Sequence, residues 1–279
     1  MSVVIAGGLV ITGTNSGGGV INANNPLIGY RNLVTALNLS STTARAGYPV
    51  SNLATPSTNL RWVGVVSTPA QTEVVTVNLQ AADDVDYIAI ARHNLYSAQI
   101  PVSVDYLQPG STPQVWTQLV APTLLPDDGP ALFRLPPAPY EALRLRLQPG
   151  LAAPTIAVLY AGACLVLQRR IYVGHTPMPM GRQSKVVNGR SEAGDFLGRI
   201  VLAEATQTQI SLQNLTAAWL RTHLKPFIDA ARETPFFFAW RPADYPREVS
   251  FAWLTDDPKP VNQLANGMMS ASFDLMGIT

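Results

Sequence analysis

Four residues in the first half of the sequence have side chains that could hold a small polar ligand. They are Tyr48, Arg61, Arg92 and His93. Arginine and histidine donate hydrogen bonds to hydroxyl or carboxylate oxygens, and an exposed tyrosine offers an apolar ring with a polar tip. Loops at one end of a β-domain could bring these side chains together around a sugar, so we take them as the candidate ligand-binding residues.

Each candidate also has a purely structural interpretation. The two arginines can cap the edge of a sheet, and the pair His93-Asn94 at a strand end can hydrogen-bond the local backbone. Trp62, Trp116 and Tyr96 could add aromatic surface for a sugar. Large rings in a small β-domain more often lie in its core, so we expect the two tryptophans to be buried.

Catalytic and metal-binding patterns are weak. The three histidines lack the spacing of a zinc site. The acidic pairs at 83–84, 127–128 and 256–257 adjoin turn residues, where aspartate commonly starts a turn. The single cysteine, Cys164, lies in an apolar run, which predicts a buried and unreactive thiol. The sequence therefore predicts no enzyme, no metal site and no cofactor.

Charge is scarce along the chain. Of 279 residues, 13% are charged and 47% are hydrophobic, and the formal net charge is +1. Soluble domains usually carry about 25% charged residues. A near-neutral chain lacks the positive field that nucleic-acid binders use, and no apolar run reaches the roughly 18 residues that span a bilayer. A surface covered by partner subunits would explain the shortage; a secreted β-protein with an uncharged polar surface is the alternative.

Residues 30–167 have the pattern of an all-β domain. Short apolar or alternating runs recur at 74–79, 87–91, 102–107, 115–120, 131–135, 143–147 and 155–159. Turn sequences rich in proline, glycine and aspartate separate them. Roughly eight short strands at this spacing predict a β-sandwich of the jelly-roll type.

Residues 1–29 have the composition of an extended arm. Glycine and asparagine are frequent, and no charged residue precedes Arg31. Such a segment cannot form a core by itself. Its apolar residues, which exceed what a flexible linker needs, are Val3, Val4, Ile5, Leu9, Val10 and Ile11. We predict that the arm orders against a neighbouring subunit, with these six as its contact residues.

Residues 168–279 predict further strands and one helix. Strand-like runs lie at 171–173, 184–187, 197–202, 207–212, 236–240, 249–254 and 268–275. An apolar stripe over 215–231 predicts the helix, with Asn214 as its N-cap and Pro226 as a kink or restart. The expected fold class is mainly β: an N-terminal arm, a jelly-roll β-sandwich, and a second β-sandwich flanked by one α-helix.

Two stretches resemble structural proteins of tailed bacteriophages. Residues 47–53, 55–58 and 61–62, followed by 85–95, are similar to the discoidin-like, galactose-binding-like jelly roll found in such proteins. Residues 236–242, 245–246 and 249–254 resemble the C-terminal part of phage minor tail and distal tail proteins. In those proteins a β-sandwich with one flanking helix forms rings that match the tail tube.

The resemblance implies a structural virion protein at the distal tail or baseplate of a long-tailed phage. Residues 168–279 would form a homo-oligomeric ring, a hexamer by preference and a trimer otherwise, and the protein would contact tail-tube, tail-tip and fibre proteins. It would be made in the host cytoplasm and located in the virion. The alternative function is a carbohydrate-binding module of the tail tip, in which residues 30–167 recognise a host-surface glycan.

Overall fold

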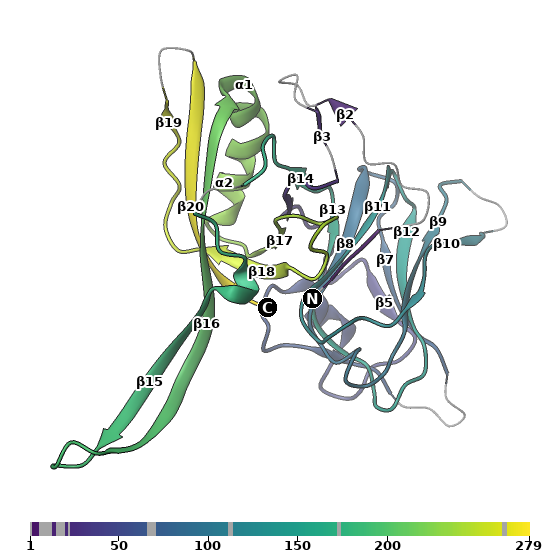
Figure 1. Cartoon of the computed structure of the whole chain (residues 1–279). Helices are drawn as coiled ribbons and strands as arrows, with labels where there is room; N and C mark the ends of the chain where they lie inside the picture. Colours follow the sequence, from purple (N-terminus) through teal and green to yellow (C-terminus); the bar gives the residue numbers. More distant parts are fainter. Residues whose placement is uncertain are drawn as a thin grey trace.

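Two bodies lie side by side in the computed structural model of this chain (Figure 1). The structure describes residues 2–5, 13–14, 20–21, 23–65, 71–110, 114–171, 174–263 and 267–279. One body is a β-sandwich from the first half of the chain, and the other is a large sheet with a helix from the second half. Among the described residues, no helix has the length and apolar character needed to cross a membrane.

The sandwich consists of two five-stranded sheets with one apolar core between them. Its sheets have the orders β1-β11-β8-β13-β6 and β10-β9-β12-β7-β5. The strands are β1 (Ser2–Ile5), β5 (Leu39–Ser41), β6 (Trp62–Val63), β7 (Glu73–Asn78), β8 (Val85–His93), β9 (Val102–Leu107), β10 (Trp116–Thr123), β11 (Ala131–Ala138), β12 (Ala142–Leu147) and β13 (Thr155–Gly162). A 3-10 helix, η1 (Val50–Ala54), precedes β6. Ile88 and Phe133 of the first sheet meet Val104 and Leu145 of the second in a core with 0% exposure. The predicted mainly-β, jelly-roll-like fold is confirmed.

The second body is built around one eight-stranded sheet. The order is β14-β4-β17-β18-β20-β16-β15, and β19 also pairs with β20. The strands are β4 (Leu27–Gly29), β14 (Leu165–Val166), β15 (Arg182–Arg190), β16 (Phe196–Thr216), β17 (Phe236–Ala239), β18 (Val249–Leu254), β19 (Val261–Asn262) and β20 (Met268–Ile278). A 3-10 helix, η2 (Met178–Met180), precedes β15. Because β4 and β14 join this sheet, residues 27–29 and 165–166 belong to the second body and not to the predicted arm and sandwich.

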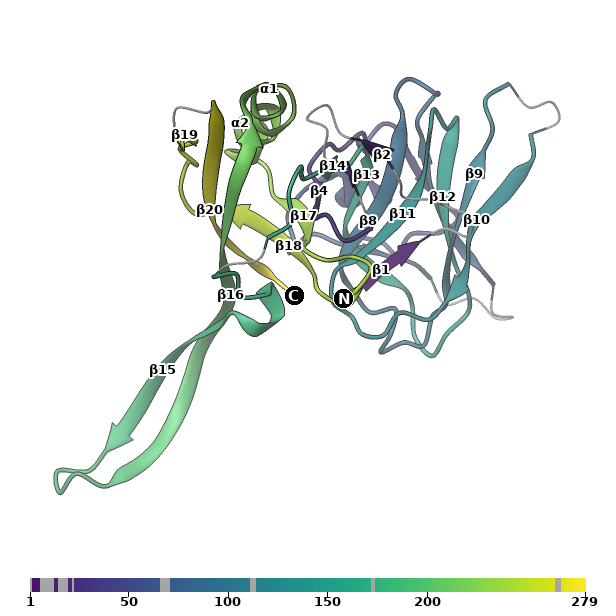
Figure 2. The same ribbon diagram turned by 45° about the horizontal axis from the view of Figure 1, so that its top comes forward.

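The sheet of the second body carries an apolar layer on each face. Side chains alternate along β17, so Phe236 faces the helical segment, where it packs against Phe227, and Phe237 faces the opposite way. There Phe237 packs against Tyr160 and Tyr87 of the sandwich. We call this second layer the seam; it comprises Val3, Leu27, Tyr87, Ala89, Ala91, Leu132, Ala157, Val158, Tyr160, Phe237, Ala239, Val249 and Phe251. The sequence predicted a second β-sandwich for residues 168–279. In the structure this region contributes one sheet, and the first sandwich packs against it as the second layer (Figure 2).

A buried ion pair lies beside the seam. Arg134 Nη2 is 3.0 Å from Asp86 Oδ2, and the two side chains are 9% and 12% exposed. The backbone N–H of Cys164 also donates to Asp86, at 2.7 Å. Burial raises the pKa of Asp86 against the opposing effect of Arg134, and burial raises the pKa of the Cys164 thiol well above its usual range. A thiol that stays protonated is unreactive, as predicted, although Cys164 is only partly buried.

The N-terminal segment pairs with the chain's own sheets. β1 runs parallel to β11, and Val3 is buried in the seam. β2 (Gly13–Thr14) and β3 (Val20–Ile21) form a small separate sheet. Residues 2–5 were predicted as part of an extended arm, but in the structure they pair with the chain's own sandwich, because the edge of β11 offers unpaired backbone groups that β1 satisfies. Contact of these residues with a neighbouring subunit stays a prediction, and Leu9, Val10 and Ile11 lie outside the described residues.

One strand is much longer than the sequence pattern indicated. The two predicted strands at 197–202 and 207–212 are parts of the single 21-residue strand β16. The strand predicted at 171–173 is absent at Ile171, and residues 172–173 lie outside the described part of the chain.

The helical segment starts two residues later than predicted. Asn214, the expected N-cap, lies within β16 at a φ of 56°. Thr216 caps the helix instead, since its side chain accepts from the N–H of Trp219. The segment consists of α1 (Ala217–Trp219), a π-helical turn (Leu220–Leu224) and α2 (Lys225–Ala231). Pro226 stands in the first turn of α2, directly after the π-helical turn, and the backbone stays helical at Leu224 and Lys225 instead of restarting.

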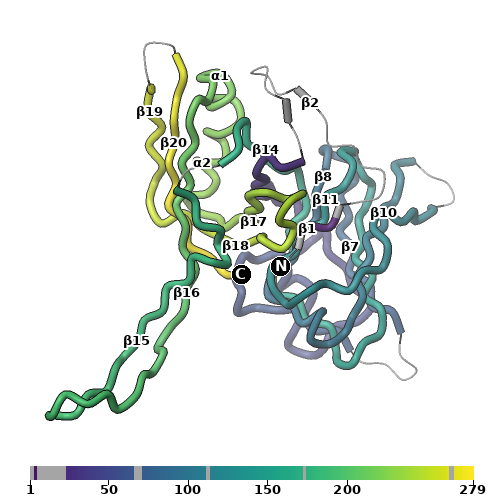
Figure 3. Tube along the Cα trace, viewed as in Figure 1, coloured from purple at the N-terminus to yellow at the C-terminus, as the bar shows by residue number. Residues whose placement is uncertain are grey.

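A two-stranded ribbon projects from the second body (Figures 1 and 3). β16 pairs with β20 only from Thr206 onward, and before that residue it pairs only with β15. We call residues 182–205 the ribbon. Its large apolar side chains, Val187, Phe196, Leu197, Ile200, Val201 and Leu202, are 50–69% exposed. An isolated two-stranded hairpin is marginally stable in water, so this surface calls for a partner.

Candidate functional site

The loop before β6 is held against the start of β13. Trp62 is fully buried in the sandwich core, and its Nε1 donates to the carbonyl of Thr43 at 3.0 Å. β6 pairs with β13, Trp62 opposite Ile156. The side-chain amide of Asn52 donates to the backbone carbonyl of Arg61 at 2.8 Å. These anchors fix Arg61 beside the strand that neighbours β8.

Arg92 has an unusual backbone conformation at the end of β8. Its φ is 53°, in the left-handed region, which costs a residue with a Cβ about 1–2 kcal/mol. Its side chain is exposed, while its neighbours Ala91 and His93 are buried. A local strain of this kind, held by the strand pairing on either side of it, is found frequently at binding sites.

The end of β8, the start of β13 and the loop before β6 enclose a hollow of about 590 Å³. We call it the arginine hollow; its lining residues are Thr58, Asn59, Arg61, Arg92, His93, Asn94, Thr155 and Ala157. Seven of these eight carry polar or charged side chains, and none is a carboxylate. The hollow is thus a polar, positively charged depression at one end of the sandwich.

The structure brings together three of the four predicted ligand residues. Arg61, Arg92 and His93 all line the arginine hollow, and Tyr48, which is 39% exposed, does not. Trp62 is in the core as predicted. Trp116 is not, because its ring stacks on the guanidinium of Arg144, 4.2 Å from ring centroid to Cζ.

Sequence reasoning missed part of the lining. Thr58, Asn59 and Thr155 were not predicted as site residues, and only their place beside β-strand ends could have indicated them. Asn94 has the predicted structural role: its amide donates to the carbonyl of Ala153 and accepts from the N–H of Thr155.

His93, which lines the hollow, has a fully buried imidazole. Its Nδ1 accepts from the backbone N–H of Leu95 at 3.3 Å and lies 3.9 Å from Asp128 Oδ1. Burial lowers the pKa of His93 to about 4, and the Asp128 carboxylate only partly opposes this effect. The ring is therefore neutral at pH 7, and with Nδ1 accepting, Nε2 carries the proton. In the described part of the chain, the buried Nε2 has no hydrogen-bond partner.

The buried His93 predicts a pH dependence of stability. Its pKa is about 4 in the folded chain and near 6.5 when unfolded, so between these pH values only the unfolded chain binds the proton. Acidification from pH 6.5 to 4 should therefore lower the free energy of unfolding, by about 3 kcal/mol over the whole interval. Urea denaturation of the wild type and of His93→Gln across this range should show a shallower slope for the variant. His175 and Asp86 also have shifted pKa values, but both proteins contain them. Equal slopes in the two proteins would therefore contradict the lowered pKa of His93.

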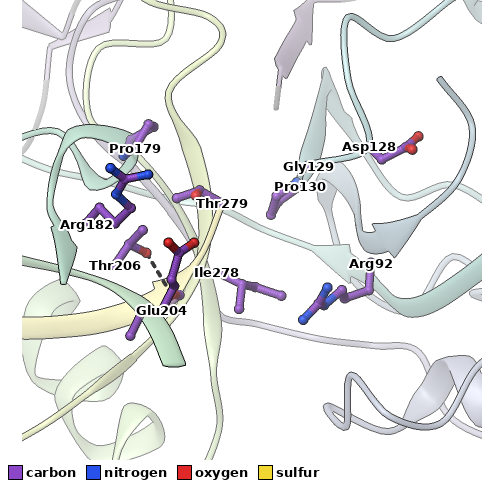
Figure 4. Close-up of a pocket in the computed structure, with 12 residues that line it drawn as sticks. Arg92, Asp128, Gly129, Pro130, Pro179, Arg182, Glu204, Thr206, Ile278 and Thr279 are labelled. Atoms are coloured by element: carbon purple, nitrogen blue, oxygen red, sulfur yellow. Dashed lines mark hydrogen bonds between the residues drawn. The ribbon is translucent and has the colours of Figure 1, made fainter. Parts of the chain in front are cut away.

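A second hollow, of about 340 Å³, lies between the two bodies. Figure 4 shows Arg92 and Asp128 coming from the sandwich and Arg182 and Glu204 from the ribbon. Asp128 accepts from the backbone N–H groups of Tyr96 and Ser97, so it holds the loop after β8. Arg92 lines both hollows. Among the described residues, no three His, Cys, Asp or Glu side chains are grouped closely enough to hold a metal ion.

Comparisons with known proteins give similarity of fold over the sandwich. No protein-family model matches the sequence, and no curated protein matches it. Among solved structures, chitosan-binding module 1 of a chitosanase/glucanase from Paenibacillus sp. IK-5 is similar with 16% identity over 48% of this chain and 99% of the module, at a TM-score of 0.41.

Two further structures show the same range of similarity. A CBM32 module from Clostridium perfringens, solved with GalNAc-β-1,3-galactose, has 10% identity over 46% of this chain and 97% of its own, at a TM-score of 0.37. A pectin-binding carbohydrate-binding module has 13% identity over 48% of this chain and 92% of its own, at a TM-score of 0.36. These values describe the fold of about half the chain, and the identity as a phage tail protein stays a prediction.

Proposed function

We propose that this protein binds a carbohydrate in the arginine hollow of its sandwich. The observation that carries the proposal is the convergence of Arg61, Arg92 and the polar side chains beside them on one depression of about 590 Å³. Guanidinium, amide and hydroxyl groups are suited to the hydroxyl and acidic oxygens of sugars. Ligand sites typically have volumes of about 300–1,000 Å³, so the hollow has room for one or two sugar rings.

The lining also limits the chemistry of the site. It contains no carboxylate and no hydroxyl beside a free base: its one imidazole, on His93, is buried and its Nδ1 is occupied by Leu95. General acid–base work on a sugar usually needs a pair of carboxyl groups. We therefore propose binding without catalysis, and without a metal or other cofactor.

A glycan array probed with the full-length chain tests this function. We expect the wild type to bind a subset of glycans, and the double variant Arg61→Ala/Arg92→Ala to bind them at least about tenfold more weakly, since one hydrogen bond to a charged group contributes about 1.5–3 kcal/mol. Arg45→Ala is the matched control, because Arg45 is an exposed arginine of the same body outside the hollow. Absence of binding to any glycan, or equal loss in the control, would refute the proposal.

We also propose an assembly role for the second body, because the ribbon exposes a row of large apolar side chains. Exposed apolar patches of this kind commonly mark protein–protein interfaces. Under the resemblance described above, the partners would be further copies of this chain in a ring of six or three, with tail-tube, tail-tip and fibre proteins beside it, and the protein would be located in the virion. The two roles are compatible, since the tip of the ribbon points away from the sandwich in Figure 1.

The ribbon's role is tested by measuring mass in solution. We expect the wild type to form oligomers in light scattering, and Ile200→Ser/Leu202→Ser to be monomeric, because two exposed apolar side chains of the ribbon are lost. Lys185→Ser on the same ribbon is the control and should leave the oligomer unchanged. If the wild type, without other proteins present, stays monomeric at every concentration up to about 100 μM, self-assembly is contradicted.

A further inference from the structure

We propose that the arginine hollow selects a saccharide that carries an anionic oxygen group, a carboxylate, sulfate ester or phosphate ester, over its neutral counterpart. This inference rests on the carbohydrate binding proposed above and specifies the class of sugar. It follows from two features of the hollow: unpaired positive charge, and the absence of Phe, Tyr and Trp from its lining.

Arg61 and Arg92 have no ion pair among the described residues. Arginines on the other strands of the sandwich have aspartate partners: Arg134 pairs with Asp86, and Arg144 and Arg146 lie within 4 Å of Asp105. Both Arg61 and Arg92 line the arginine hollow, which no carboxylate lines. Arg92 also lines the hollow between the two bodies, toward which its side chain points in Figure 4. Two unpaired cations in a lining without a carboxylate favour an anionic ligand.

The lining lacks the surface on which neutral sugars usually stack. None of the eight lining residues is Phe, Tyr or Trp, and the exposed Tyr48 and Tyr96 are not among them. Binding must therefore come from hydrogen bonds. Those of a neutral sugar compete with water, whereas hydrogen bonds between a guanidinium and an oxyanion are roughly twice as strong as neutral ones. Charge is thus the chief source of affinity that this lining offers.

His93 lines the same hollow, but its side chain is fully buried. The imidazole is therefore not exposed to a ligand in the hollow. The hydrogen bonds to a ligand must come from Arg61, Arg92 and the amide and hydroxyl side chains of the lining.

The strained backbone of Arg92 fits this assignment. A left-handed φ at an arginine is retained only where the surrounding structure enforces it, and here it gives an exposed side chain between two buried neighbours. The side chain lines both the arginine hollow and the hollow between the two bodies.

Titration calorimetry with the full-length protein distinguishes charge from shape. The probes are oligogalacturonate and its methyl ester, which share a backbone and differ in charge, together with a sulfated and a phosphorylated oligosaccharide, each with its unmodified form. We expect at least one charged member to bind about tenfold or more tightly than its neutral form, and salt to weaken only the charged member. Arg61→Ala and Arg92→Ala should remove that preference, and Arg45→Ala should not.

The outcomes separate the two levels of the proposal. If carboxylate, sulfate or phosphate forms bind more tightly, the inference is supported and the preferred group is identified. If neutral forms bind as tightly as all three charged forms, charge selection is wrong while carbohydrate binding stands. If no saccharide binds at all, both are wrong.

Discussion

Replacing Phe237 with alanine is expected to lower the free energy of unfolding by about 3–5 kcal/mol. Phe237 is 0% exposed, and its ring lies 5.4 Å from that of Tyr160 and 5.0 Å from that of Phe251. The substitution leaves a cavity in the seam, between two sheets that cannot easily close around it. Chemical denaturation followed by tryptophan fluorescence and circular dichroism would measure the loss.

A second phenylalanine provides the control for this experiment. Phe196 on the ribbon is 66% exposed, so Phe196→Ala should change the stability of the monomer by no more than about 0.5 kcal/mol. The seam also predicts that the two bodies unfold together, because its side chains come from both. Two separate transitions in the wild type, or equal effects of the two substitutions, would show that the seam does not join the bodies.

Replacing Arg134 with methionine is expected to cost about 3–5 kcal/mol, because it leaves Asp86 buried without its cation. The pKa of Asp86 is already raised by burial, so protonation can relieve the unpaired charge at low pH. We therefore expect the destabilisation to be larger at pH 8 than at pH 5. Urea denaturation at the two pH values would measure both quantities.

The double variant Asp86→Asn/Arg134→Met separates charge from packing. With both charges removed, the destabilisation should fall well below that of Arg134→Met alone and should lose its pH dependence. The amide can still accept from the N–H of Cys164. A double variant that is as unstable as the single one would show that Arg134 acts through its packing.

Most strands could be predicted because buried strands show a regular pattern of apolar residues in the sequence. The run 87–91 is apolar without alternation, and in the structure Ile88 faces the sandwich core while Tyr87 and Ala89 face the seam. A continuous apolar run of this kind indicates that the strand is buried on both faces. It was the one feature of this run from which a second body covering the sandwich could have been predicted. What covers it could not be predicted, because strands as short as β4 and β14 carry no signal.

Pairings between distant segments account for the main errors. The apolar pattern of β16 is interrupted at Ala203–Thr206, so the sequence predicted two strands there. In the structure, pairing with β15 and β20 keeps β16 continuous across this interruption. The helix cap moved from Asn214 to Thr216 for the same reason, since β20 keeps pairing with β16 as far as Thr216. Local sequence carries no record of such partners.

The candidate site was predictable only where it adjoins strand ends. Arg61, Arg92 and His93 each stand at the end of a strand, which places them at one end of the sandwich. Thr155 joins them because β13 pairs with β8, a fact of topology. Tyr48 was wrongly grouped with them, because the direction of a loop side chain depends on contacts that the sequence does not reveal.

The most direct test of carbohydrate binding at the arginine hollow is one affinity ratio. Calorimetric titration of the tightest glycan from the array into the wild type and into Arg92→Ala compares two proteins that differ at an exposed side chain lining the hollow. We predict that the dissociation constant rises at least about tenfold in the variant, with the melting temperature unchanged or higher, since alanine does not worsen the strained φ. An unchanged dissociation constant would place the ligand elsewhere and contradict the assignment of the site.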